Sequence, residues 1–180
     1  AKNFKYDKIL NVLYADGDVI VDDTKEGVRI YTEQIEYLKS EEIILTKGGS
    51  KATDKISTIT GDEFEYKKNS NILNAKGNVE INDEQNDVVI YAEDITYLRN
   101  NEIFFTKGVT KSVIQSKYNF KSKDVFLDRN KMELSSNEKS NIQDDNFTHY
   151  QLDKFVFEIN SKILKGENIL VITNFSKPKS

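Results

Sequence analysis

Residues 77–108 read GNVEINDEQNDVVIYAEDITYLRNNEIFFTKG, and this stretch decides the fold. Apolar and polar residues alternate in it as they do in β-strands, and polar clusters at 82–87 and 99–101 interrupt the alternation as turns do. An earlier copy, GDVIVDDTKEGVRIYTEQIEYLKSEEIILTKG, occupies residues 17–48, which is 77 − 17 = 60 residues upstream with no gap. The chain therefore contains an internal repeat built from β-strands.

A shorter period lies inside each copy. Gly17, Gly48, Gly77 and Gly108 are 31, 29 and 31 residues apart, and each interval holds two candidate strands. A unit of this size cannot bury its own apolar face, so successive units must stack to share a core. We predict an all-β fold, an open roll of stacked two-strand units of about thirty residues. Residues 1–173 are expected to form one domain and 174–180 a linker, and residues 135–146 are predicted to be a polar loop.

The phase of the alternation changes within each copy. Arg29 is expected to face water, which turns Val28 and Ile30 inward. The next apolar pair, Ile35 and Tyr37, falls on odd numbers instead of even ones. Because such a change needs an extra residue in the ladder, we predict a bulge or corner at residues 33–34, repeated at 93–94.

The composition argues against several classes of function. The net charge is −4 and the acidic residues are spread along the chain, so no basic stripe for nucleic acid is present. Cysteine is absent and His149 is the only histidine, which leaves no residue set for a zinc site or a catalytic triad. The acidic pairs, such as Asp62-Glu63 and Glu93-Asp94, are typical of solvated turns. We therefore predict no enzymatic activity, no metal and no cofactor.

What remains is a stripe of apolar residues on the inward side of the strands. It can be the plain core of a roll, or the lining of a groove that holds a lipid chain. The inward set, predicted to line one apolar interior, comprises Val19, Val21, Val28, Ile30, Ile35, Tyr37, Ile43, Leu45, Phe64, Tyr66, Val79, Ile81, Val88, Ile90, Ile95, Tyr97, Ile103, Phe105, Phe155 and Phe157.

The ends of a stacked roll expose unpaired strands. Residues 9–15 are unusually apolar for such an edge, and strand addition by a partner is a common use of one. We expect a partner to dock on this stretch, through Ile9, Leu10, Val12 and Tyr14, while residues 167–173 face the next element of the same chain.

Two segments carry a resemblance to a known family. Residues 75–79, AKGNV, and 92–97, AEDITY, resemble the OstA-like repeats of lipopolysaccharide transport proteins, which read A-x-G-N-V and then A-D-x-[VI]-x-Y. The match is good over residues 61–110, fair over 1–60 and weak over 111–172. In the first copy Thr32 and Gln34 stand where the family has Ala and Asp.

The resemblance implies a periplasmic β-jellyroll, or β-taco, attached to the outer membrane. Such a domain receives lipopolysaccharide, with the lipid A acyl chains in its groove, and passes it to the outer-membrane translocon. The implied partners are a head-to-tail OstA-like bridge protein, an outer-membrane lipoprotein plug and a β-barrel expected beyond Ser180. The A-x-G-N-V spacing and the tail with Pro178 favour the N-terminal domain of the outer-membrane assembly protein. The free-standing bridge protein and a non-lipid β-solenoid binding module are the alternatives.

Overall fold

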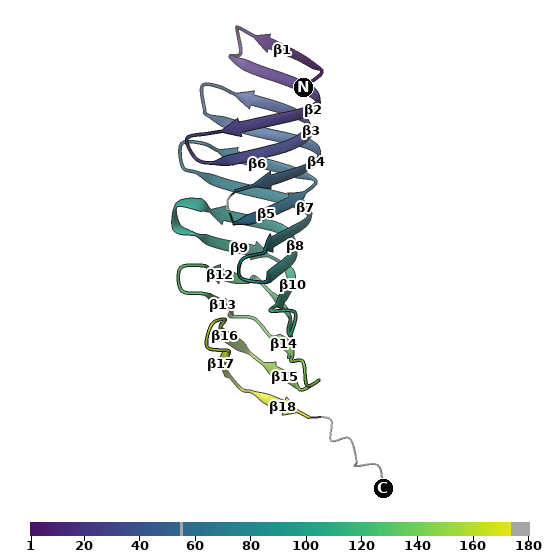
Figure 1. Cartoon of the computed structure of the whole chain (residues 1–180), viewed down its shortest axis with the longest axis vertical. Coiled ribbons are helices and arrows are strands. Elements are labelled where there is room, and N and C mark those ends of the chain that lie inside the picture. The colour runs from purple at the N-terminus through teal and green to yellow at the C-terminus, as the bar shows by residue number, and fades with distance from the viewer. Residues whose placement is uncertain (55, 174–180) are drawn as a thin grey trace.

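The computed structural model describes residues 1–54 and 56–173, so the predicted linker at 174–180 lies outside the described residues. The chain forms an 18-stranded antiparallel sheet that folds over on itself into an elongated roll, with its N-terminal end at the top of Figure 1. Within the described ranges the only helical element is a single 3-10 turn, Arg99–Asn101, and no helix there has the length and apolarity to cross a membrane. The all-β class and the roll of stacked strand units are confirmed.

The strands form two faces that meet along a row of corners. Face A contains β1, β6, β9, β12, β13, β16 and β17, face B contains β5, β10, β11, β14, β15 and β18, and the long strands β2, β3, β4, β7 and β8 cross a corner and belong to both. The strand bounds are β1 Asn3–Asp7, β2 Val12–Asp23, β3 Val28–Leu38, β4 Ile43–Thr53, β5 Ser57–Gly61, β6 Glu63–Lys67, β7 Ile72–Asp83, β8 Val88–Leu98, β9 Ile103–Lys107, β10 Val109–Ile114, β11 Tyr118–Lys123, β12 Phe126–Asp128, β13 Glu133–Ser136, β14 Ser140–Gln143, β15 His149–Leu152, β16 Lys154–Glu158, β17 Ile163–Glu167 and β18 Leu170–Ile172.

The predicted corners are confirmed. Between β2 and β3 the register shifts so that two residues, Gly17 and Asp18, stand opposite Glu33 alone. The second copy repeats this, with Gly77 and Asn78 opposite Glu93. Both glycines have φ of 74°, and the residue after each has φ of 48°, so the bulged pair turns left-handed and bends the strand from one face to the other.

Replacing Gly77 with alanine should lower the free energy of unfolding by about 1–2 kcal/mol from the left-handed backbone, with a further loss from crowding. An added Cβ would come within 2.9 Å of the Asp62 Cβ, and closer still to its carboxylate. Gly108→Ala is the matched control, because Gly108 has φ of +82° but nothing within 4 Å of its Cβ position. Urea denaturation of both variants measures the difference, and equal losses would show that the contact with Asp62 is wrongly placed.

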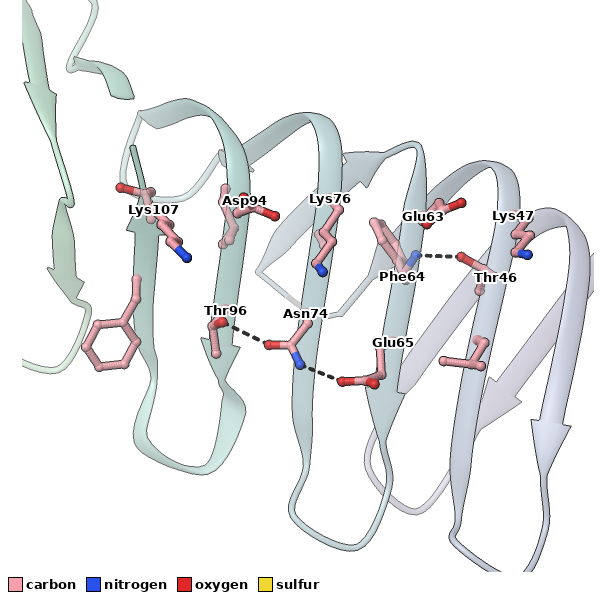
Figure 2. A pocket seen from close by; sticks show the side chains of 15 residues that line it. Thr46, Lys47, Glu63, Phe64, Glu65, Asn74, Lys76, Asp94, Thr96 and Lys107 are labelled. Carbon is pink, nitrogen blue, oxygen red and sulfur yellow. Dashed lines mark hydrogen bonds between the residues drawn. The ribbon is translucent and has the colours of Figure 1, made fainter. Parts of the chain in front are cut away.

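The outer surface of face A is slightly hollowed, with a volume of about 480 Å³, and both polar side chains and apolar ones such as Leu45 and Phe105 line the hollow (Figure 2). Thr96 Oγ1 donates to Asn74 Oδ1 and Asn74 Nδ2 to Glu65 Oε1, both at 2.8 Å, across three strands. Lys76 stands directly between Glu63 and Asp94 on the neighbouring strands. Opposite charges on adjacent strands stabilise a sheet, so this hollow is explained as the wet outer wall of the roll.

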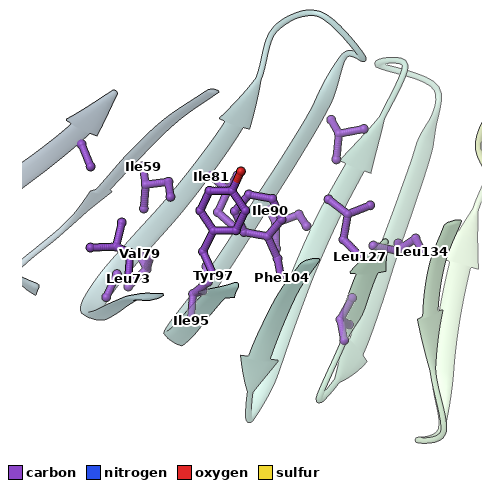
Figure 3. Close-up of a cluster of buried hydrophobic side chains, with 14 of the residues drawn as sticks. Ile59, Leu73, Val79, Ile81, Ile90, Ile95, Tyr97, Phe104, Leu127 and Leu134 are labelled. Atoms are coloured by element: carbon purple, nitrogen blue, oxygen red, sulfur yellow. The ribbon is translucent and has the colours of Figure 1, made fainter. Parts of the chain in front are cut away.

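The interior of the roll is filled by apolar side chains from both faces (Figure 3). In the second repeat the Tyr97 and Phe104 rings stack at 3.8 Å between centroids, with 9° between their planes. Tyr66, Ile81 and Ile90 are 0% exposed. Large side chains that are this fully buried leave little free volume between the faces, so the middle of the roll is a close-packed core.

The predicted phase is wrong in two strands. Ile43, Leu45, Ile103 and Phe105 were expected to point inward, but the residues buried between them are Ile44, 3% exposed, and Phe104, 1% exposed, while Phe105 is 38% exposed. The cause is the register of the ladder, which sets Ile44 opposite Tyr37 and Phe104 opposite Tyr97 on the inner side. Three consecutive apolar residues, Ile43 to Leu45, carry no alternation from which the phase can be read.

The predicted N-terminal edge is also wrong. Ile9 and Leu10 lie in the exposed turn between β1 and β2, and Val12 and Tyr14 lie in the first half of β2, which pairs with β1 on one side and β3 on the other. The true edge of face A is therefore β1. The edge of face B is the second half of β2, residues 19–23, which has no strand outside it among the described residues, whereas β5 covers the equivalent part of β7.

The predicted polar loop at residues 135–146 is half strand. It contributes the end of β13 and the whole of β14. Ser136 and Ser140 are buried, and the Ser140 hydroxyl is 2.8 Å from that of Ser122 on the neighbouring strand. A serine can face the interior here because its hydroxyl forms a hydrogen bond with a neighbouring hydroxyl or carbonyl. The polar composition of the segment does not reveal such a partner.

Candidate functional site

The hairpin turns of each face form a rim on the side of the roll away from the corners. We call the row at residues 8–11, 39–42, 68–71, 99–102 and 129–132 rim A, and the row that includes 24–27 and 84–87 rim B. The two rims face each other across the interior. Contacts between them decide whether the interior is closed along that side.

Rim A carries one arrangement four times, which we call the tyrosine clasp. A tyrosine hydroxyl donates to the side chain of an Asn or Glu five residues later, at 2.6 to 3.1 Å. That Asn or Glu has a positive φ, and its backbone carbonyl accepts the N–H of a Lys or Arg from the next turn, at 3.0 to 3.2 Å. The four clasps are Tyr6–Asn11–Lys39, Tyr37–Glu42–Lys68, Tyr66–Asn71–Arg99 and Tyr97–Glu102–Arg129.

Two of the clasps reach rim B. Arg99 Nη2 donates to the Glu26 carbonyl at 3.1 Å, and Asn71 Nδ2 donates to the Glu26 carboxylate at 3.0 Å. The side chain of Arg129 is 5% exposed and binds Asp83 through Nε at 3.1 Å. These bonds join the two sides of the interior: the Arg99 clasp reaches the β2–β3 turn of the first repeat, and the Arg129 clasp reaches the end of β7 in the second repeat.

The Arg129 clasp is a buried charge cluster. Arg129 Nη1 lies 3.0 Å from Glu102 Oε2 and donates to the Tyr97 hydroxyl at 3.1 Å, and Tyr97 in turn donates to Glu102 at 2.9 Å. Burial, together with the nearby carboxylates of Asp54 and Glu102, raises the pKa of Tyr97. The tyrosine therefore stays neutral and acts as a donor to the carboxylate.

The Lys68 clasp, in the first repeat, is looser. Lys68 Nζ lies 3.3 Å from Glu42 Oε2 but 3.9 Å from Asp23 Oδ2, and that buried oxygen has no hydrogen-bond partner among the described residues. Burial lowers the pKa of Lys68, but the hydrogen bond to Glu42 and the nearby charges raise it overall. The hydrogen bond from Tyr37 lowers the pKa of Glu42, so both groups are charged at neutral pH.

A cavity of about 440 Å³ lies beside the Lys68 clasp at the N-terminal end of the roll. Its volume is within the usual range of small-ligand pockets, about 300–1,000 Å³. Apolar side chains from both faces form its inner wall, and polar side chains of rims A and B form its mouth. It extends to the second half of β2, where no further strand covers face B. The inner wall consists of Leu13, Val21, Ile35, Tyr37 and Ile44, and the mouth includes Asp23, Thr24, Lys25 and Lys68.

Only part of the inward set lines this cavity. Val21, Ile35 and Tyr37 line it, while Leu13 and Ile44 line it without having been predicted. Most of the others are buried against one another in the core, and their predicted role in lipid binding stays a prediction. These core members are Val19, Val28, Ile30, Phe64, Tyr66, Val79, Ile81, Val88, Ile90, Ile95, Tyr97, Phe155 and Phe157.

Of the polar residues considered in the sequence, the acidic pair Asp22-Asp23 lies at the mouth of the cavity, and the others lie outside it. His149 is exposed in β15, and Asp62 accepts a hydrogen bond from Asn78 Nδ2 at 2.9 Å at a corner. No group of three or more His, Asp or Glu side chains is placed to hold a metal ion in the part of the chain that the structure describes. The candidate site is thus an apolar cavity with a charged mouth, suited to holding a hydrophobic group.

Comparison with known proteins gives one likeness to report. No family model matches the sequence, and no curated protein sequence does either. Among solved structures, the chain is similar to the crystal structure of LptH, the LptA-homologous periplasmic component of the conserved lipopolysaccharide transport device from Pseudomonas aeruginosa. The identity is 10%, the match covers 86% of this chain and 99% of that chain, and the TM-score is 0.38.

Proposed function

We propose that this chain is an OstA-like lipopolysaccharide transport domain, which holds lipid A acyl chains in the apolar interior of its roll and passes the lipid on in the periplasm. One observation carries the proposal: the interior between the two faces is apolar and opens as a cavity at the N-terminal end. The A-x-G-N-V and A-D-x-[VI]-x-Y elements support it, since they fall on the bulged corner of β7 and on β8. The role needs no catalytic group.

Within this pathway the preferred assignment is the N-terminal periplasmic domain of the outer-membrane assembly protein LptD, attached to its β-barrel and to the lipoprotein plug. The repeat spacing favours it. The alternative is a free-standing bridge protein like LptA, and a non-lipid β-solenoid binding module is the third candidate. Binding to purified lipid A but not to a polysaccharide array supports either transport assignment, while the reverse result supports the third.

The edges of the roll suit a head-to-tail partner. Among the described residues, β1 has no outer neighbour on face A and residues 19–23 of β2 have none on face B at the N-terminal end, and β17 and β18 are the outermost strands of the same two faces at the C-terminal end. A second OstA-like roll can therefore add a strand to each face at once. Backbone hydrogen bonds would supply the affinity, and the shared interior would continue from one roll into the next.

Photo-crosslinking should show which side of the strands contacts the bound lipid. A photoreactive residue in place of Ile35 or Tyr37 should capture lipopolysaccharide, because both side chains line the cavity. The same residue in place of Arg29, on the outer side of β3, should capture none. Mass spectrometry of the adducts measures the yield, and equal labelling at inner and outer positions would contradict an interior site.

A further inference from the structure

The two repeats share an inner frame of identical side chains but fill it differently. At an offset of 60 residues, Leu13, Ile35 and Tyr37 of the first repeat have identical counterparts, Leu73, Ile95 and Tyr97, in the second. The three counterparts are 1 to 3% exposed. Only the residues around these three side chains differ. The second repeat therefore shows which side chains pack against them when no cavity is present.

Three side chains are smaller or shorter in the first repeat than in the second. Ile44 replaces Phe104, whose ring stacks on Tyr97, and Val21 replaces Ile81. Lys68 replaces Arg129, at an offset of 129 − 68 = 61, since the N–H of each donates at 3.0 Å to the carbonyl of Glu42 or Glu102. Within residues 1–54 and 56–173 no aromatic ring covers Tyr37: the Lys68 ammonium lies 5.6 Å from the centre of its ring, and the cavity of about 440 Å³ lies beside these two side chains.

The covering strand is also different. In the second repeat β5 pairs with residues 80–83 of β7 and brings Ile59 into the core. In the first repeat the equivalent residues, 20–23 of β2, have no outer neighbour among the described residues, and Ile20 is 58% exposed. The cavity therefore opens along this edge of face B.

The charge at the mouth does not select a charged ligand. Lys68 is matched by Glu42 at 3.3 Å and faces Asp23 at 3.9 Å, so positive and negative groups are balanced there. The inner wall offers only apolar surface besides the Tyr37 hydroxyl, which already donates to Glu42 at 2.8 Å. The apolar area that such a cavity can bury sets its affinity, which favours a hydrocarbon chain.

We propose that the first repeat alone is the chain-binding site, and that it holds one hydrocarbon chain against Tyr37, in the place that Phe104 occupies in the second repeat. This inference deepens the proposed function and rests on it. The second repeat is the same frame closed by its own side chains and by the Arg129 clasp. Acyl binding is then confined to the N-terminal end of the roll.

Isothermal titration calorimetry of the full chain with saturated fatty acids, from octanoic to hexadecanoic acid below their micelle concentrations, tests the site. Affinity should rise about fourfold per added methylene and level off once the cavity is full, with one chain bound per protein. The double variant Val21→Ile, Ile44→Phe copies the second repeat and should weaken binding at least tenfold. Leu45→Phe, on the outer side of the same strand, is the matched control and should bind as the unmodified chain does.

A second measurement uses the unmodified protein and so does not depend on the variants folding. A photoreactive fatty acid should label peptides containing Ile35, Tyr37 and Ile44, and not those containing Ile95 or Phe104. Labelling of the second repeat, or full binding by a folded double variant, overturns the assignment to the first repeat and leaves the transport function standing. No fatty-acid binding by the unmodified chain overturns both.

Discussion

Replacing Arg129 with methionine should lower the free energy of unfolding by about 3–5 kcal/mol, the cost of breaking a buried ion pair from one side. The change removes the cation that binds Asp83 and Glu102, and Asp83 is only 1% exposed. Asp83 would keep its hydrogen bonds from the Asn86 N–H and Nδ2, but its buried charge would have no cation beside it. Urea denaturation followed by far-ultraviolet circular dichroism measures the loss.

Lys68→Met is the matched control in the first repeat. Lys68 occupies the same place in its clasp, but its side chain is 32% exposed and it lies 3.9 Å from Asp23. Water screens a contact of this kind, so the loss should stay below about 1 kcal/mol. Equal losses in the two variants would show that the Arg129 clasp stabilises the fold no more than the Lys68 clasp does.

Phe104→Ala should cost about 3–5 kcal/mol, because it deletes a ring that is 1% exposed and leaves a hole beside Tyr97. The neighbouring change, Phe105→Ala, is the control. Phe105 lies on the outer side of β9 and meets Phe126 edge-to-face at 4.9 Å, a contact worth about 0.5–1.5 kcal/mol. Thermal and urea unfolding of the pair decide the phase of β9, and a larger loss at Phe105 would restore the phase predicted from the sequence.

The repeat made the fold predictable. Two copies at a fixed offset show which residues share a role, and the switch from Val28 and Ile30 to Ile35 and Tyr37 located the corner from parity alone. The prediction of which residues point inward is wrong where consecutive residues are all apolar, as at Ile43 to Leu45. There the pattern permits either face to be buried, and only the pairing with Tyr37 decides.

The site was less predictable, because its parts come from different turns. The tyrosines of the four clasps are 31, 29 and 31 residues apart, the same intervals as the glycines, so a signal was present in the sequence. Their cations lie in the following turn, and Arg129 falls one residue out of the 60-residue offset. The cavity depends on Ile44, the very position where the phase was misread.

The corners differ in the continuity of the backbone along the roll. In the first two repeats β2, β3, β4, β7 and β8 run unbroken from one face to the other, and only β5 and β6 are divided, at Asp62. Beyond Lys107 each strand ends at the corner, as β9 does before β10 and β11 before β12. There one to three residues join the faces, and backbone hydrogen bonds, such as that from the Asp124 N–H to the Gly108 carbonyl at 3.1 Å, tie neighbouring corners together. Continuous strands therefore frame the cavity, whereas the end beside β17 and β18 depends on the bonds between its corner residues.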